Sequence, residues 1–154
     1  MTTSILFANA QLIDGSIVDI ATDNGLIAWI GIPAQSPVIC HKTINLDGYV
    51  LSTSLVEPHA HLDKAFLADR ISNPDGDLMG AIRGLEAVRS TITHNDIVER
   101  ATRAVNLMSQ NGVTSIRTHA DTTISGGLSS VLALLEVKKN CAHFMDLQVA
   151  MLLE

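Results

Sequence analysis

Two histidines two residues apart, His59 and His61, are the residues of this sequence best suited to chemistry. They end an apolar run that is typical of a strand, so their side chains are expected to project from the same face. Neutral imidazoles in this arrangement can bind one ion of zinc, iron or manganese. A bare His-x-His also occurs by chance on protein surfaces, so the context of the pair must decide between the two interpretations.

A second polar cluster, formed by Arg117, His119 and Asp121, repeats the two-residue period. This period predicts three ionisable side chains on one face of a later strand, near its open end. We expect them to support the metal ligands and the neighbouring loops, and His119 is disfavoured as a ligand itself. The alternative is an Arg117–Asp121 ion pair that closes the interior of the sheet. Asp63 is expected to orient the end of the first strand, with a further metal ligand as the alternative.

The elements that must position these residues change in character near residue 50. Before it, short apolar runs are separated by turn dipeptides, and Asn24-Gly25 is a strong hairpin signal. This pattern predicts a small antiparallel β unit. The predicted strands cover residues 4–13, 17–21, 26–31 and 38–46.

After residue 50 the pattern is that of strands alternating with helices, which favours a parallel α/β structure. The predicted elements are helices over 78–88 and 97–108, a strand over 113–118, a helix over 128–139 and a strand over 147–153. Thr93 and Asp96 resemble a capping box for the second helix, and Asn111-Gly112 supplies its stop. If this parallel α/β pattern belongs to a (β/α)₈ barrel, which needs roughly 250 residues, we expect this chain to be truncated.

Composition excludes several classes of function. The chain has 154 residues, 47% of them hydrophobic, and a net charge of −6 with scattered Lys and Arg. It therefore offers no basic face to nucleic acid or to an anionic membrane. Cys40 and Cys141 lie far apart, which argues against a disulfide framework and a cysteine zinc site. No apolar run reaches the ~18 residues of a membrane span, and we expect a globular, cytoplasmic protein.

Five motifs occur along the chain in a fixed order that covers almost its whole length. They are Val56-Glu-Pro-His-Ala-His-Leu-Asp63, Gly76-Asp77-Leu78, Gly112-Val-Thr-Ser-Ile-Arg-Thr-His-Ala-Asp121, Leu135-Glu-Val-Lys-Lys139 and Asp146-Leu-Gln-Val149. In this order and at nearly this spacing, the set resembles the cytosine deaminase-like branch of the amidohydrolase superfamily. That branch includes bacterial cytosine deaminases and triazine-ring amidohydrolases.

The resemblance implies a fold and a site. The fold class is α/β, the N-terminal part of a (β/α)₈ (TIM) barrel over residues 51–154, preceded by a small β-sandwich segment over residues 1–50. His59 and His61 would bind one divalent metal ion, zinc or iron. A third histidine, an aspartate and a proton-shuttling glutamate would lie beyond residue 154. In such enzymes metal-activated water attacks the amino-bearing carbon of a heterocycle, and ammonia leaves.

Two residues are expected to contact the small-molecule substrate, an amino-substituted heterocycle. Glu154 falls where cytosine-cleaving relatives carry a glutamine, and an ionised glutamate only accepts hydrogen bonds, which disfavours cytosine. This holds if Glu154 is native rather than a vector scar. Leu78 is expected to line the pocket, or else to belong to the core.

Two alternatives to a deaminase stay open. One is a cyclic amidase of the same superfamily, and the other is a non-catalytic fragment or pseudoenzyme. Two histidines fall short of the usual three protein ligands, so the isolated chain is expected to be inactive. Exposed apolar helix faces in a chain of this length also predict a homo-oligomer.

Overall fold

The computed structural model describes residues 4–124 and 126–153. The chain divides into two compact units at the boundary between Thr53 and Ser54. This boundary lies close to the change of pattern near residue 50 in the sequence. Each unit contains its own sheet, so the two are described separately.

The first unit is a four-stranded sheet with the order β3-β2-β1-β4. Its strands are β1 (Ile5–Gln11), β2 (Ile17–Asp23), β3 (Leu26–Gly31) and β4 (Lys42–Asn45). Asn24 and Gly25 both have positive φ, 50° and 79°, between the antiparallel strands β2 and β3. This is the backbone of the predicted hairpin.

The expectation of a wholly antiparallel unit is wrong, because β4 pairs with β1 in parallel. A short hairpin would have placed the fourth strand antiparallel beside the third. Instead, residues 32–41 carry the chain past β2 and β1 to the far edge of the sheet, where β4 runs parallel to β1. Pro33 and Pro37 in this connection have no backbone N–H to donate to a ladder.

The second unit contains a parallel sheet with the order β5-β6-β7. The strands are β5 (Leu55–Ala60), β6 (Val113–Thr122) and β7 (Asp146–Leu153). The helices are α1 (Leu78–Val88), α2 (His94–Gln110) and α3 (Ser129–Cys141), with short 3₁₀ turns η1 (Leu62–Lys64), η2 (Ala68–Arg70) and η3 (Arg89–Thr91). The predicted α/β class is confirmed, and the described sheet is open rather than closed into a barrel.

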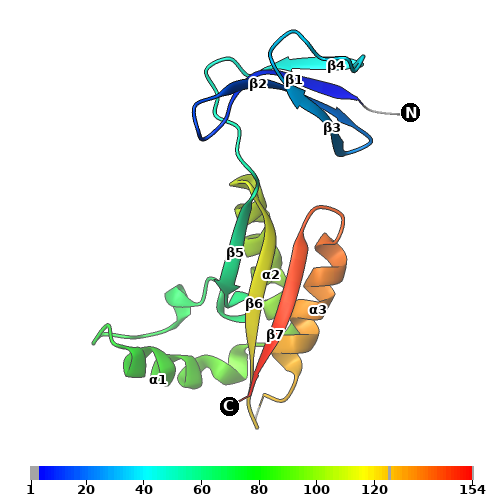
Figure 1. Cartoon of the computed structure of the whole chain (residues 1–154). Helices are drawn as coiled ribbons and strands as arrows, with labels where there is room; N and C mark the ends of the chain where they lie inside the picture. The colour runs from blue at the N-terminus through cyan, green and yellow to red at the C-terminus, as the bar shows by residue number, and fades with distance from the viewer. Residues whose placement is uncertain (1–3, 125, 154) are drawn as a thin grey trace. The chain divides into compact units, whose positions relative to one another are not determined.

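Helices α2 and α3 pack against each other and against one face of this sheet (Figure 1). The core between them includes Ile97, Val105, Ile116, Leu134 and Leu147, each at most 2% exposed. Burying apolar side chains of this size is the main stabilising term for the unit. The opposite face of the sheet carries no described helix, and the polar clusters of the sequence lie there.

The ends of α2 are those that the sequence predicts. The Thr93 hydroxyl accepts the N–H of Asp96 at 3.2 Å, and Gly112 follows the helix with φ of 87°. The apolar stripe of α1 behaves differently, since Leu78 is 75% and Ile82 is 44% exposed. None of the helices in the described ranges is long and apolar enough to cross a bilayer.

Candidate metal site at the ends of β5 and β6

His59 and His61 converge on the open face of the sheet. Their Nε2 atoms are 3.3 Å apart, and their ring centroids are separated by 5.2 Å. Ala60 between them points the other way and is 9% exposed, whereas both histidines are exposed. As the sequence predicts, the two-residue spacing places both side chains on one face and brings two nitrogen donors together.

This separation fits two ligands of one ion. Metal–nitrogen bonds of about 2.1 Å at a tetrahedral angle place the two nitrogens roughly 3.4 Å apart, close to the observed 3.3 Å. Among residues 4–124 and 126–153, however, no group of three or more His, Cys, Asp or Glu side chains is arranged to hold a metal. The described part of the chain thus brings together two nitrogen donors suited to one ion.

His119 joins the pair in space. Its ring lies 4.2 Å from that of His59 at an interplanar angle of 28°, and 5.8 Å from that of His61. The sequence predicts a supporting position for this residue, and the structure places it in direct contact with His59. Its Nδ1 atom is buried and has no hydrogen-bond partner in the described structure.

Lys64 links the histidine pair to two carboxylates. Its ammonium lies 2.7 Å from Oδ2 of Asp121, 3.6 Å from Oδ2 of Asp63 and 3.3 Å from Nδ1 of His61. Asp63 is 4% exposed and also accepts the N–H of Asp121 at 3.2 Å, which ties the end of β5 to β6. A metal-binding role of Asp63 stays a prediction.

The environment of His61 favours its neutral ring. Burial lowers the pKa of His61, and the Lys64 ammonium lowers it further, against the opposing effect of Asp63 and Asp121. The net direction is below the ordinary histidine value. A neutral imidazole is the form that binds metals.

Arg117 does not pair with Asp121, and that alternative is wrong. Its guanidinium donates two hydrogen bonds to Oε1 of Gln148, at 3.0 and 2.9 Å. Arg117 and Gln148 are direct neighbours in the β6–β7 register, whereas four residues along a strand separate Arg117 from Asp121 by roughly 13 Å. Asp121 is instead paired with Lys64.

A buried guanidinium holds the turn that follows His61. Arg100 of α2 is 5% exposed and donates to the carbonyl oxygens of Asp63 and Ala65, at 3.0 and 2.6 Å, and to Oδ2 of Asp96. Asp96 in turn accepts from Arg70 at 2.7 Å.

Sequence reasoning missed Arg100 and the structural role of Lys64. For Arg100 the available signal was its position four residues after Asp96 on one helix. For Lys64 it was the adjacent Asp63 and a second carboxylate, Asp121, predicted on the neighbouring strand.

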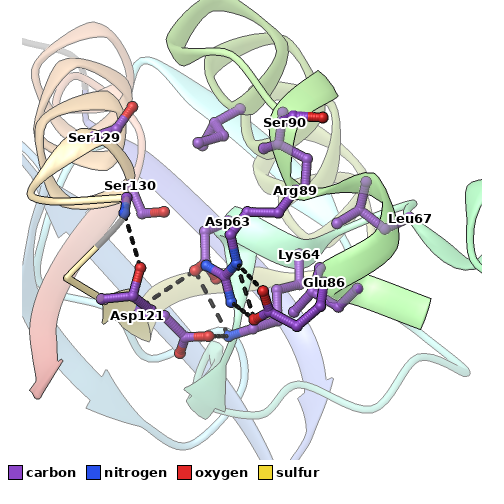
Figure 2. A pocket seen from close by; sticks show the side chains of 14 residues that line it. Asp63, Lys64, Leu67, Glu86, Arg89, Ser90, Asp121, Ser129 and Ser130 are labelled. Carbon is purple, nitrogen blue, oxygen red and sulfur yellow. Dashed lines mark hydrogen bonds and ion pairs between the residues drawn. The ribbon is translucent and has the colours of Figure 1, made fainter. Parts of the chain in front are cut away.

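A cavity of about 560 Å³ adjoins this network. Asp63, Lys64 and Asp121 line one side of it, and Glu86 and Arg89 form an ion pair on another (Figure 2). Leu78, the predicted pocket residue, begins α1 and does not line this cavity. Glu154 lies outside the described residues.

Comparison with known proteins places this arrangement in a family, although no protein-family model matches the chain. Over 107 residues the chain is 36% identical to the pterin deaminase of Rhizobium rhizogenes, a match that covers 67% of this chain and 24% of that protein. The structure is similar to 5-methylcytosine deaminase from Klebsiella pneumoniae, with a TM-score of 0.82 and 30% identity. The chain belongs to the amidohydrolase superfamily.

The amidohydrolase relationship extends over nearly the whole chain but over only part of each relative. The match to 5-methylcytosine deaminase covers 96% of this chain and 36% of that one. N-isopropylammelide isopropylaminohydrolase from Burkholderia multivorans gives a TM-score of 0.79 at 25% identity, covering 96% of this chain and 37% of that one. The chain thus spans the N-terminal part of cytosine deaminase-like amidohydrolases, as its motifs predict.

Proposed function

We propose that this amidohydrolase chain carries the first two metal ligands of an enzyme that hydrolytically deaminates an amino-substituted heterocycle. The observation that carries the proposal is the 3.3 Å separation of the His59 and His61 Nε2 atoms at the carboxyl end of a parallel strand. Catalytic sites of (β/α)₈ enzymes lie at this end of their strands. These two residues would hold one divalent ion, zinc or iron, which when bound supplies Lewis-acid activation of water.

The substrate class is supported by the relatives. Two relatives are named for the deamination of pterin and of 5-methylcytosine, which are both small amino-substituted rings. In this proposal Lys64, Asp121 and Asp63 keep the His61 ring in place, and the substrate approaches over the open face of the sheet.

The metal ligands are tested by cobalt(II) binding to the 154-residue chain, measured by visible absorption and by competition with a chelator. We expect His59→Ala and His61→Ala each to weaken binding by at least about tenfold, because each removes one of two donors. His143→Ala is the matched control, since His143 contacts Phe144 and not the site. Equal affinity of all four proteins would refute the site.

The reaction is tested by ammonia release from pterin and 5-methylcytosine. The metal-loaded 154-residue chain is expected to show negligible turnover, because its described residues supply two ligands where catalytic zinc usually has three from the protein. In any protein that contains this chain and releases ammonia, His61→Ala should abolish the release. Release that persists in this variant would exclude a catalytic metal at His61.

A further inference from the structure

The backbone of His59 is weakly fixed by the sheet. The pairing of β5 with β6 is irregular between Glu57 and Ala60, and Pro58 has no N–H to contribute. The N–H of His59 donates to Oε1 of Glu57 at 2.9 Å rather than to the neighbouring strand. The strand period places His59 on the open face, but regular strand pairing does not hold its backbone in register there, so a side-chain contact is needed to fix the plane of its ring.

The ring of His119 supplies this contact. It lies nearly parallel to the His59 ring, with 4.2 Å between centroids and 28° between planes. We propose that His119 is a positioning residue, which holds the plane of His59 by stacking so that Nε2 of His59 faces Nε2 of His61. The importance of this orientation for metal binding rests on the function proposed above.

Stacking and ligation are distinguishable by geometry. The lone pair of an imidazole nitrogen lies in the ring plane, so two ligands of one ion need ring planes whose lone pairs converge. The planes of His59 and His61 are inclined by 51° and their Nε2 atoms are 3.3 Å apart. The planes of His59 and His119 are inclined by only 28° and their centroids are 4.2 Å apart, so in-plane lone pairs of the two stacked rings do not readily converge on one ion. His119 is therefore placed to support His59 rather than to act as a third ligand.

The strand that carries His119 holds the backbone of this residue in place. β6 is the central strand and pairs on both sides, with His119 opposite Ala150 of β7. The flanking residues Thr118 and Ala120 are both 0% exposed in the layer below the helices. Asp121, two residues on, is tied to Lys64. The ring that stacks on His59 is thus carried by the best-anchored strand of the unit.

Three substitutions separate the roles of ring and nitrogen. His119→Phe keeps a flat ring without nitrogen, His119→Ala removes the ring, and His119→Gln keeps a polar group without leaving a cavity. In the metal-free chain, ¹³C–¹H NMR of the His59 ring should show the wild-type upfield shift in the phenylalanine variant. The alanine and glutamine variants should lose it. Arg117→Ala, on the same face of the same strand, is the control that should leave the His59 signals unchanged.

Cobalt(II) affinity is the second measurement. We expect it to stay within about threefold of wild type for His119→Phe and to fall roughly 10–100-fold for the alanine and glutamine variants, as for other partners that orient metal ligands. An equal loss in phenylalanine and alanine would overturn stacking in favour of the nitrogen. Unchanged His59 signals in His119→Ala would overturn the contact itself. If wild type and His59→Ala bind cobalt equally, the proposed function fails, while the NMR result still decides the positioning role.

Discussion

The two faces of the β5-β6-β7 sheet differ in what holds their side chains in place. Along β6, Ile116, Thr118 and Ala120 point into the core under α2 and α3, and each is at most 1% exposed. On the other face, His119 and Asp121 contact only a few polar partners. One strand therefore contributes alternately to a hydrophobic core and to a candidate site.

Residues that stabilise the fold and residues suited to chemistry therefore alternate along the strand, with a period of two. The covered face is held by burial, which is non-directional and involves many contacts at once. The open face is held by single directional contacts, such as the Lys64–Asp121 ion pair at 2.7 Å. Substitutions on the two faces should consequently affect different properties, and the following experiments test that separation.

The largest effect is expected on the covered face. Leu147→Ala removes a side chain that is 1% exposed in the core, and such substitutions cost about 2–5 kcal/mol. Far-UV circular dichroism at 222 nm during urea unfolding measures this loss, since all described α-helices lie in the second unit. Leu152→Ala is the matched control on the same strand, because Leu152 is 38% exposed. Similar destabilisation by both would contradict the separation.

An intermediate effect is expected at Asp96, which connects η2 to α2. Burial alone would raise the pKa of Asp96, but hydrogen bonds from Arg100 and Arg70 outweigh it and hold the pKa below its ordinary value of 3.8. Asp96→Asn should therefore cost about 2 kcal/mol at neutral pH, since it leaves Arg100 buried without its carboxylate.

The pH dependence of Asp96 follows from the direction of its shift. Because the folded-state pKa lies below the unfolded one, the carboxylate stabilises fully above the unfolded value and loses this contribution as the pH falls through the folded value. The destabilisation by Asp96→Asn should then shrink below pH 3.8. Urea unfolding at neutral and acid pH measures it, and a difference that is constant with pH would count against the ionised network.

The smallest effect is expected at Arg117 on the open face. Its partner is the exposed Gln148, so Arg117→Ala should change the free energy of unfolding by no more than about 0.5 kcal/mol. The same unfolding experiment measures this. A loss comparable to that of Asp96→Asn would show that the open face contributes to stability as well.

Local patterns in the sequence predicted the structural features that depend only on residues close together in the chain. The Asn24-Gly25 hairpin and the Thr93 cap follow from backbone and side-chain preferences within a few residues, and both are present. The placement of His59 and His61 on one face follows from the strand period. The motifs of the chain also identify its family from the sequence alone.

The contacts that the sequence did not predict depend on the alignment of separate elements. Arg117 meets Gln148 because β6 and β7 align in one register among several that spacing alone allows. The stacking of His119 on His59 depends in the same way on where β5 breaks its pairing with β6. The stripe of α1 was visible in the sequence, yet nothing local reveals whether Leu78 is covered.

The buried guanidinium of Arg100 also links two parts of the chain that are expected to open together. The turn after His61 contains only the short 3₁₀ segments η1 and η2. Because Arg100 binds the carbonyl groups of Asp63 and Ala65, separating this turn from α2 breaks both of these hydrogen bonds of a buried guanidinium. Residues 62–65 and α2 are thus expected to open as one cooperative unit of local unfolding, so their amides should exchange with similar free energies of opening.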